Sequence, residues 1–455
     1  MALRSSVSRG REAWLAAAFF ATIPLLGAAT AALPWSLDDV AGVALLVTLL
    51  LALAVGLEPG TAPAGWPTGR GVLLLALAWR GLSAIAQRLH PLSSVYTLDA
   101  QVYEREAWAI ARAWLSDTRA PELLDASFNV FAYEALAAGV YVLVGRSMLT
   151  LQILGALMGS LAVYYAWRSA RQLIGSERAA MVAVVLALWP SHVVWSSQSL
   201  RDPWVFFLLS RAVWSAVLWL EHGKAAEWAK ALGFAALVAV FRLSTVILLA
   251  AALLVMSAYV AWRAAGWRTR LVLVFLSLAG LALLGALGVS AAAGEILAGL
   301  PGHLSVIRRS LATGGSAFLT DARYTSWLDL LAFLPLGAVY VLFAPFPWAA
   351  QNAAQLGSAL ENSLLCLLVA AGLPRARNVW LLVRERAGAF VGLVALLGVG
   401  FLALVEGNLG TAYRHKVQFL PLLLILAGAG WPVVAGGARR SVAPPVVRPA
   451  VPAGL

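Results

Sequence analysis

Charged side chains that could carry chemistry gather in three short stretches of a sequence that is 62% hydrophobic. The stretches are LDAQVYEREAW at residues 98–108, SSQSLRDPW at residues 196–204 and GNLGTAYRHK at residues 407–416. A carboxylate can act as a general base on a hydroxyl or an amine, and Arg and Lys bind phosphate groups. Carboxylates together with cations therefore indicate proton abstraction combined with an anionic ligand.

The first stretch combines a carboxylate with an amphipathic pattern. Asp99 stands just before a segment in which apolar residues recur at positions 107, 110, 111 and 114, a spacing that predicts a helix along a membrane surface. Asp99 could simply cap this helix, because Asp is a good N-cap residue. At the mouth of a membrane cavity the same carboxylate could act as a general base, with Tyr103 and Glu104 beside the substrate.

The second stretch places an ion pair between two strongly apolar segments. Arg201 and Asp202 follow a run of hydroxyl and amide side chains, and Asp202 with Pro203 suits the N-cap and first position of a new helix. The pair could therefore be purely structural, as an anchor at the membrane boundary. Alternatively, it could face a cavity and position a substrate.

The third stretch is cationic. Two glycines and Asn408 allow an unusual backbone turn, and Arg414, His415 and Lys416 follow in a row. Such a cluster could meet lipid head groups, or it could clamp a phosphate, since Arg offers a planar fork and Lys a point charge. Three more basic residues could serve the same end: Arg308, Arg309 and Arg323.

Composition identifies the scaffold that must hold these residues. Only 12% of the 455 residues are charged, whereas soluble domains carry roughly a quarter. Long apolar runs recur along the chain, each near the ~20 residues that cross a bilayer, and they lack the alternation of a strand barrel. The sequence predicts an all-α, polytopic integral membrane protein with roughly 12–14 transmembrane helices and a juxtamembrane helical outer loop.

The net charge of +12 does not indicate a nucleic-acid partner. Lys and Arg accumulate in the cytoplasmic loops of membrane proteins, and no basic stripe interleaved with aromatic residues occurs. The single Cys366 can form no disulfide within the chain, and no zinc-type Cys/His spacing exists. Isolated Asp and Glu residues could support a divalent cation, but the sequence assigns no ligand set and no certain cofactor.

The positive-inside rule orients the segments, and among the expected crossings are those at about 13–33, 71–89, 203–220, 271–291 and 418–435. Segment 128–145 is expected to lie at the outer interface, because a crossing there would carry the basic loop RSARQLIGSER outside. A hairpin at about 229–262 is expected to turn near Arg242. The expected divisions begin with an N-terminal helix hairpin at 1–70 and a transmembrane module at 71–292, which includes an outer loop at 90–147. A second outer loop at 293–327, C-terminal transmembrane helices at 328–438 and a disordered cytoplasmic tail at 439–455 follow. The part 328–374 is expected to contain one or three crossings.

This threading gathers the unusual polar residues on the outer side. Basic residues there go against the positive-inside trend, so they need another reason, and an anionic ligand is the simplest. The residues are Asp99, Tyr103, Glu104, Arg201, Asp202, Arg242, Arg308, Arg309, Arg323, Arg414, His415 and Lys416.

Two ordered segments resemble a known family. LDAQVY leads into a juxtamembrane helix, and LVGRSMLTLQILGALMGSLAVYYAWRSARQLIGSERAAMVAVVLALWPSHVVWSS follows at residues 143–197. Over roughly residues 90–265 the chain resembles bacterial membrane glycosyltransferases of the C-type (GT-C) superfamily, in the protein O-mannosyltransferase and aminoarabinose-transferase-like branch. The resemblance lies in the ordered whole, because no single motif is decisive.

The resemblance implies an enzyme of the cytoplasmic membrane with its active site on the outer face. Such proteins pass a sugar from a polyprenyl-phosphate carrier to a lipid, glycan or protein acceptor. It assigns the catalytic carboxylate to Asp99, a second acidic site to Asp202 beside Arg201, and a basic position to Arg242. Outer-loop cations would bind the carrier phosphate, and the remaining partners are membrane lipid and the acceptor.

The chain departs from the family at the first stretch, where Ala100 replaces the usual Glu, so a two-acid site would need Glu104 or another partner. Two other functions remain open. A polymerase or ligase of lipid-linked surface polysaccharide would share the helix count and the outer basic residues. A transporter or flippase would show internal repeats and polar residues at the bilayer midplane, and neither pattern is clear here.

Overall fold

The protein is a helical bundle with the composition of a multi-pass membrane protein. The computed structural model describes residues 37–56, 67–89, 98–116, 127–264, 266–267, 271 and 289–433. Within these ranges every regular element is a helix, apart from an isolated antiparallel bridge between Ala317 and Asn408. Seven helices are long and apolar enough to cross a membrane, or eight if the bent pair α7–α8 forms one span.

The amino-terminal half follows the expected segments closely, because runs of apolar residues mark its helices. The interfacial candidate 128–145 forms a helix, α5, and the hairpin expected near Arg242 forms α10 and α11. The helices are α2 (Leu37–Gly56), α3 (Gly69–Leu89), α4 (Leu98–Leu115), α5 (Phe128–Val144), α6 (Met148–Ile174), α7 (Ser176–Leu188), α8 (Pro190–Ser196), α9 (Asp202–His222), α10 (Ala225–Phe241) and α11 (Leu243–Ala264).

The carboxy-terminal half is more broken. The expected outer loop 293–327 contains most of a long helix, α13, and α19 ends at Ala429 instead of continuing to 435. The elements are α13 (Val289–Leu311), α14 (Trp327–Phe343), η1 (Pro347–Ala349), α15 (Ala353–Gly372), η2 (Leu373–Arg375), α16 (Ala376–Arg384), α17 (Arg386–Val405), α18 (Leu409–His415), η3 (Lys416–Gln418) and α19 (Leu420–Ala429).

Some expected segments are not among the described residues, and others are short. The expected helix 13–33, most of 271–291 and the tail 439–455 lie outside the described ranges. Three apolar helices of 10–17 residues, α5, α14 and α19, fall below the length of a full span. The described residues therefore establish a polytopic helical protein with seven or eight candidate spans.

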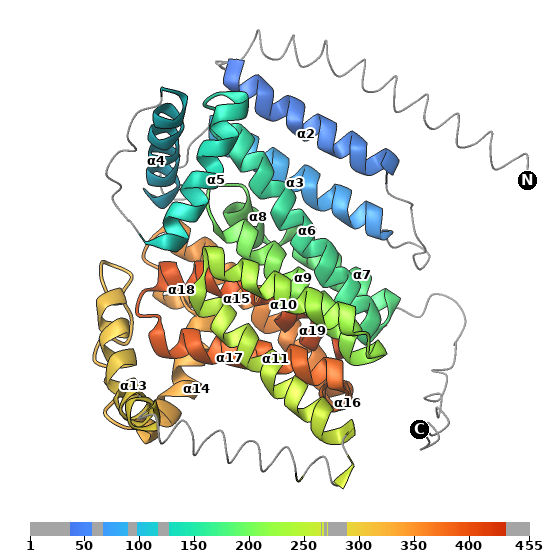
Figure 1. Cartoon of the computed structure of the whole chain (residues 1–455), viewed down its shortest axis with the longest axis vertical. Helices are drawn as coiled ribbons and strands as arrows, with labels where there is room; N and C mark the ends of the chain where they lie inside the picture. The colour runs from blue at the N-terminus through green and yellow to red at the C-terminus, as the bar shows by residue number, and fades with distance from the viewer. Residues whose placement is uncertain are drawn as a thin grey trace, which may run out of the picture.

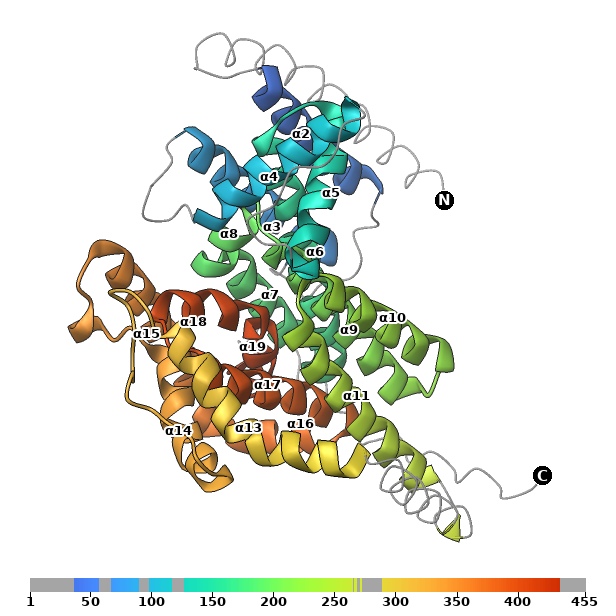
Figure 2. The ribbon, with the colours of Figure 1, turned by 60° about the vertical axis from the view of Figure 1, so that its left-hand side comes forward.

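The long helices α2, α3, α6 and α9 run roughly side by side, and α4 lies across their ends at the left of Figure 1. Helices α4 and α5 pack on each other. In Figure 2 the carboxy-terminal helices, coloured yellow to red, gather below α2–α6, and α18 lies beside α15. The site described below forms where these two groups of helices meet.

Small residues let the helices approach closely around α6, which packs against α2, α3, α7 and α9. Gly155 and Gly159 form a small-xxx-small pair, a pattern that allows backbones to come together in membranes. A Cβ on Gly159 would lie 2.4 Å from the Cβ of Ser196. A Cβ on Gly155 would lie 3.1 Å from the carbonyl oxygen of Ser196. These glycines therefore bring the serine-rich segment 196–199 into the bundle.

A break at Pro190 turns the chain toward the site. Helices α7 and α8 meet at 56°, because proline has no N–H to donate to the carbonyl of Leu186. The fully buried Arg80 of α3 supplies the missing donors, with bonds to the carbonyl oxygens of Ala187 (2.9 Å) and Leu186 (3.4 Å) and to Ser196 Oγ (3.0 Å). His192 Nδ1 lies 2.8 Å from the same guanidinium. The bend between α7 and α8 is thus held by a buried guanidinium of α3 that bonds to polar groups of both helices.

Candidate functional site

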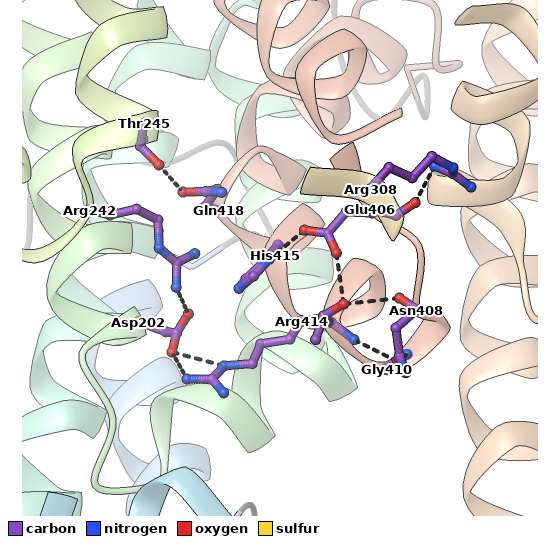
Figure 3. Close-up of polar contacts among 11 residues, drawn as sticks. Asp202, Arg242, Thr245, Arg308, Glu406, Asn408, Gly410, Arg414, His415 and Gln418 are labelled. Atoms are coloured by element: carbon purple, nitrogen blue, oxygen red, sulfur yellow. Dashed lines mark hydrogen bonds and ion pairs between the residues drawn. The ribbon is translucent and has the colours of Figure 1, made fainter. Parts of the chain in front are cut away.

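Four charged residues from distant parts of the chain form one continuous series of ion pairs, and Figure 3 shows the part that runs from Arg242 through Asp202 to Arg414. Asp202 Oδ1 accepts a hydrogen bond from Arg242 Nη2 at 2.7 Å, and Oδ2 accepts from Arg414 Nη2 at 2.5 Å and Nε at 3.0 Å. The second Nη of Arg414 donates to Asp99 Oδ2 at 2.6 Å. The series Asp99–Arg414–Asp202–Arg242 therefore joins α4, α18, the start of α9 and the junction of α10 with α11. All four residues belong to the set expected on the outer side.

Local structure aims Asp202 at its partners. Asp202 was expected to be the N-cap of this helix. In the structure Arg201 is the N-cap, and Asp202 is the first residue of α9. Arg201 makes no side-chain cap hydrogen bond, and the Asp202 carboxylate is satisfied by two guanidinium groups. An acidic residue in the first helical turn is also favoured by the helix dipole.

The two carboxylates of the series differ in access. Asp202 is fully buried, whereas the side chain of Asp99 is 53% exposed. Burial by itself lowers the pKa of Arg414, but Asp202 and then Asp99 outweigh this effect and raise it above its ordinary value. Arg414 therefore remains a guanidinium cation, which Asp202 binds on its buried side and Asp99 on its exposed side.

Arg201 adds a further cation. It makes no ion pair with the residues that the structure describes, and its Nε is buried without a hydrogen-bond partner there. It acts electrostatically on both Tyr103 and Arg242, which places it beside the series. Two carboxylates then face three guanidinium groups, so the cluster of Asp99, Asp202, Arg201, Arg242 and Arg414 carries an excess of one positive charge.

Tyr103 lies against this cluster. Its side chain is buried, and its ring meets that of Tyr133 edge-on with the centroids 5.5 Å apart. The Tyr133 hydroxyl lies 3.1 Å from Ser199 Oγ. Burial raises the pKa of Tyr103 above its ordinary value, so the phenol stays protonated. The serine-rich segment before Arg201 thus supports the wall of the site.

The cationic run at α18 does not form one clamp. Successive residues of an α-helix point about 100° apart, so the neighbouring side chains reach different partners. Only Arg414 joins the ion-pair series, whereas His415 and Lys416 bond to other groups. The partners are Glu361 for Tyr413 (2.6 Å), Asp202 and Asp99 for Arg414, Glu406 for His415 (2.6 Å) and Asn362 for Lys416 (2.5 Å).

His415 and Glu406 form a neutral–anionic pair beside Arg242. Burial alone raises the pKa of Glu406, but hydrogen bonds from His415 and Thr411 outweigh it and lower that pKa. Burial lowers the pKa of His415, and Arg242 lowers it further. At neutral pH a neutral imidazole therefore donates Nδ1–H to the Glu406 carboxylate, and His415 adds no positive charge to the site.

The arginines of the second outer region have other places. Arg308 is buried, and it donates to the carbonyl oxygens of Ala403 (3.3 Å), Phe318 (3.2 Å) and Glu406. It satisfies carbonyls at the carboxyl end of α17, which a helix end leaves without partners, so it is not available to a phosphate. Arg309 and Arg323 are exposed and make no bond to the ion-pair series in the described residues.

Glu104 is also separate from Asp99. Its carboxylate makes two hydrogen bonds with Arg146, at 2.8 Å and 3.0 Å, and a third with the Tyr141 hydroxyl at 3.4 Å. The partner acid of Asp99 is instead Asp202, reached through Arg414. The sequence alone did not distinguish these two arrangements, since Glu104 is nearer in the chain.

Sequence reasoning missed Glu361 and Arg80. Glu361 of α15 is buried and accepts four hydrogen bonds: from Trp189 Nε1 (2.5 Å), Ser191 N (2.8 Å), Ser191 Oγ (2.6 Å) and the Tyr413 hydroxyl. Each residue is an ionisable group inside an apolar helix, and that signal would have found both.

No group of three or more His, Cys, Asp or Glu side chains that could hold a metal ion occurs in the described ranges. Asp99 and Asp202 already bind guanidinium groups, so a divalent cation would have to displace Arg414 to reach them. The arrangement offers an accessible carboxylate, a fixed cation behind it and a free cation beside it. Comparison of the chain with protein-family models and with curated proteins gives no match.

Proposed function

We propose that the protein transfers a sugar from a polyprenyl-phosphate-linked donor to a lipid, glycan or protein acceptor on the outer face of the cytoplasmic membrane. The observation that carries the proposal is the half-exposed Asp99 carboxylate, bound to an arginine that a buried second carboxylate holds in place. This arrangement provides a base and a cation at one point of a membrane protein, which carrier-dependent transfer requires.

The reaction needs few groups. The acceptor oxygen attacks the anomeric carbon while its proton passes to Asp99, and the bond from that carbon to the phosphate oxygen breaks, leaving both electrons on the phosphate. Displacement with a single base inverts the anomeric centre. Because the leaving phosphate is already stable, positioning and charge stabilisation are the main contributions of the protein.

The cations can divide the work. Arg414 orients Asp99, and Arg201 is the best candidate for the donor phosphate because no described carboxylate neutralises it. Arg242 also retains a buried Nη1 without a described partner. A guanidinium whose position is fixed before the substrate arrives stabilises developing charge without a cost of reorganisation.

For the lipid part of the donor we propose an apolar cavity of about 490 Å³ between α14, α15, α16 and α19, lined by residues such as Leu342, Val369, Trp380 and Leu426. For the full topology we propose roughly 12–14 crossings, with the short helices α10 and α19 and the segments 13–33 and 271–291 among them. With the basic N-terminus in the cytoplasm, the three crossings proposed before Asp99 put it outside.

The decisive experiment is Asp99→Asn, assayed in membranes for transfer from a mixed extract of polyprenyl-phosphate sugars. Loss of a general base typically costs about 10²–10⁴ in rate, and we expect a fall in this range with donor binding retained. Asp321→Asn, at an exposed acid far along the chain, is the matched control. Full transfer by the Asp99 variant would remove the proposal.

A second variant tests the phosphate site. Arg201→Ala should raise the KM for the donor about tenfold with a smaller change in kcat, because a uniformly used binding contact is lost. An unchanged KM would mean that Arg201 only anchors the start of α9.

A further inference from the structure

A second, polar cavity lies beside α18 on the side of Tyr413. Its volume is about 560 Å³, within the range of small-molecule sites. It is lined by α8, the first turns of α15 and the start of α18. No residue of the ion-pair series is among its lining residues, and the transfer steps described above assign it no role.

The lining of this cavity has no charged side chain. Its polar groups are hydroxyls and amides, and its remaining surface is aliphatic and aromatic, with Trp195 and Tyr413 as the two rings. A phosphate or carboxylate ligand would lack the cation that such groups need in a partly buried site. A lipid chain would leave the amides and hydroxyls without partners, which is costly.

Glu361 fixes the direction of the hydroxyl groups. Ser191 Oγ and the Tyr413 hydroxyl both donate their protons to its carboxylate, at 2.6 Å each. Their oxygen lone pairs are therefore left to accept hydrogen bonds from whatever occupies the cavity. Glu361 itself is buried behind these two side chains and is not among the lining residues.

Two amide N–H groups complement these acceptors. The side-chain oxygens of Asn352 and Gln355 accept from backbone N–H groups of Gln355 (2.9 Å) and Gln351 (2.8 Å). The amide nitrogens of these two residues are therefore the ends that remain for a ligand.

We propose that this cavity binds a neutral, polyhydroxylated ligand, a saccharide. Sugar hydroxyls both donate and accept, which matches the paired sets of oxygen acceptors and N–H donors, and sugar C–H faces pack on rings such as Trp195. The Trp195 ring also lies under the Arg414 guanidinium, 5.9 Å from its centroid. Arg414 bonds to Asp99 in turn, so one guanidinium links the wall of the cavity to the catalytic carboxylate. In this position the saccharide is the acceptor, a role that rests on the function proposed above.

The binding test uses the full chain in lipid nanodiscs and saturation-transfer NMR. The probes are glucose, galactose, mannose, N-acetylglucosamine and maltose, with glucuronate and glucose 1-phosphate as charged counterparts. We expect saturable binding of at least one neutral sugar and weaker binding of its charged counterpart. Gln355→Ala should raise the Kd about five- to tenfold, the effect of one lost hydrogen bond.

Gln172→Ala, at an exposed amide of α6, is the control and should leave the Kd unchanged. Absence of saturable binding by every neutral probe overturns the proposal, as does equal binding of the charged probes or an equal loss in the control. Sugar binding without carrier-dependent transfer would reject the proposed enzyme and keep the cavity, whereas transfer without sugar binding would do the reverse.

Discussion

The two sides of α18 bury a carboxylate in different ways. On one side Asp202 is neutralised by two guanidinium groups, and on the other Glu361 is satisfied by an indole N–H, a backbone N–H and two hydroxyls. Neighbouring residues, Arg414 and Tyr413, serve the two sites. A step of one residue along α18 therefore separates a carboxylate paired with guanidinium groups from a carboxylate satisfied by uncharged donors.

The difference concerns what each carboxylate controls. Asp202 fixes the position of a cation, and that cation can exchange contacts with an anionic ligand. Glu361 fixes the direction of hydroxyl protons and adds no charge to the cavity that they line. The first arrangement is suited to a phosphate and a base, the second to the recognition of an uncharged molecule.

Removal of Arg414 should have the largest effect on this comparison. Arg414→Gln leaves the buried Asp202 with a single guanidinium, and a broken buried pair typically costs about 3–5 kcal/mol in the free energy of unfolding. The measurement is denaturant titration of the purified protein in detergent. Arg309→Gln, at an exposed site, should stay within about 0.5 kcal/mol. A loss below about 1 kcal/mol would show that the series is no stronger than a surface pair.

Glu361→Gln should cost less. The side chain keeps its shape, but an NH₂ donor replaces one of the accepting carboxylate oxygens. One of the donors around Glu361 therefore loses its partner, which should lower the free energy of unfolding by about 1–3 kcal/mol. The same titration measures it, with the exposed Glu385→Gln as control. If this variant is as damaging as Arg414→Gln, the distinction between paired and hydrogen-bonded carboxylates does not hold.

Lys416 supplies a pH-dependent test on the Glu361 side. Burial lowers the pKa of Lys416 from 10.5 to about 8, against an opposing effect of Glu361. Between these values the unfolded chain binds more protons than the folded one, so stability should rise with pH, by up to about 1.4 kcal/mol per unit. Thermal unfolding of the wild type and of Lys416→Met from pH 8 to pH 10 measures the slope. Equal slopes would contradict the prediction.

The smallest effect is expected at Glu104. Its partner Arg146 is about half exposed, so Glu104→Gln should change stability by about 0–1 kcal/mol. Transfer activity should not change, because the carboxylate does not contact the ion-pair series. A loss of activity comparable to that of Asp99→Asn would restore Glu104 as the second acid of the site.

Much of the fold could be predicted because bilayer thickness sets the length of apolar runs. The expected segment 71–89 corresponds to α3 at Gly69–Leu89, and 203–220 to α9 at Asp202–His222. The helix α13 was expected to be an outer loop, since Pro301 and several polar residues interrupt its apolar pattern. Composition cannot distinguish a polar helix at a membrane surface from a loop.

The site was predictable as a set but not in its pairings. Asp99, Asp202, Arg242 and Arg414 were expected on one side, and the structure brings them together. The sequence could not show that His415 and Lys416 bond to residues outside the series. Side chains at about 100° intervals around a helix reach different neighbours, and the sequence does not show which helices pack around α18. Threading gives the side of the membrane, whereas helix packing gives the contact.

Arg80 has a consequence for how the protein is made. Helix α3 emerges from the ribosome before its partners, and Ser196 follows Arg80 by 116 residues. At ~5–20 residues per second, synthesis of that interval takes on the order of 10 s. During this time the guanidinium lacks the carbonyls that later receive it, at a cost of about 2.5–3.5 kcal/mol in the centre of a bilayer. Insertion of α3 therefore becomes more favourable once α7 and α8 arrive, and a pause in translation before Pro190 would prolong the time for which the guanidinium lacks these partners.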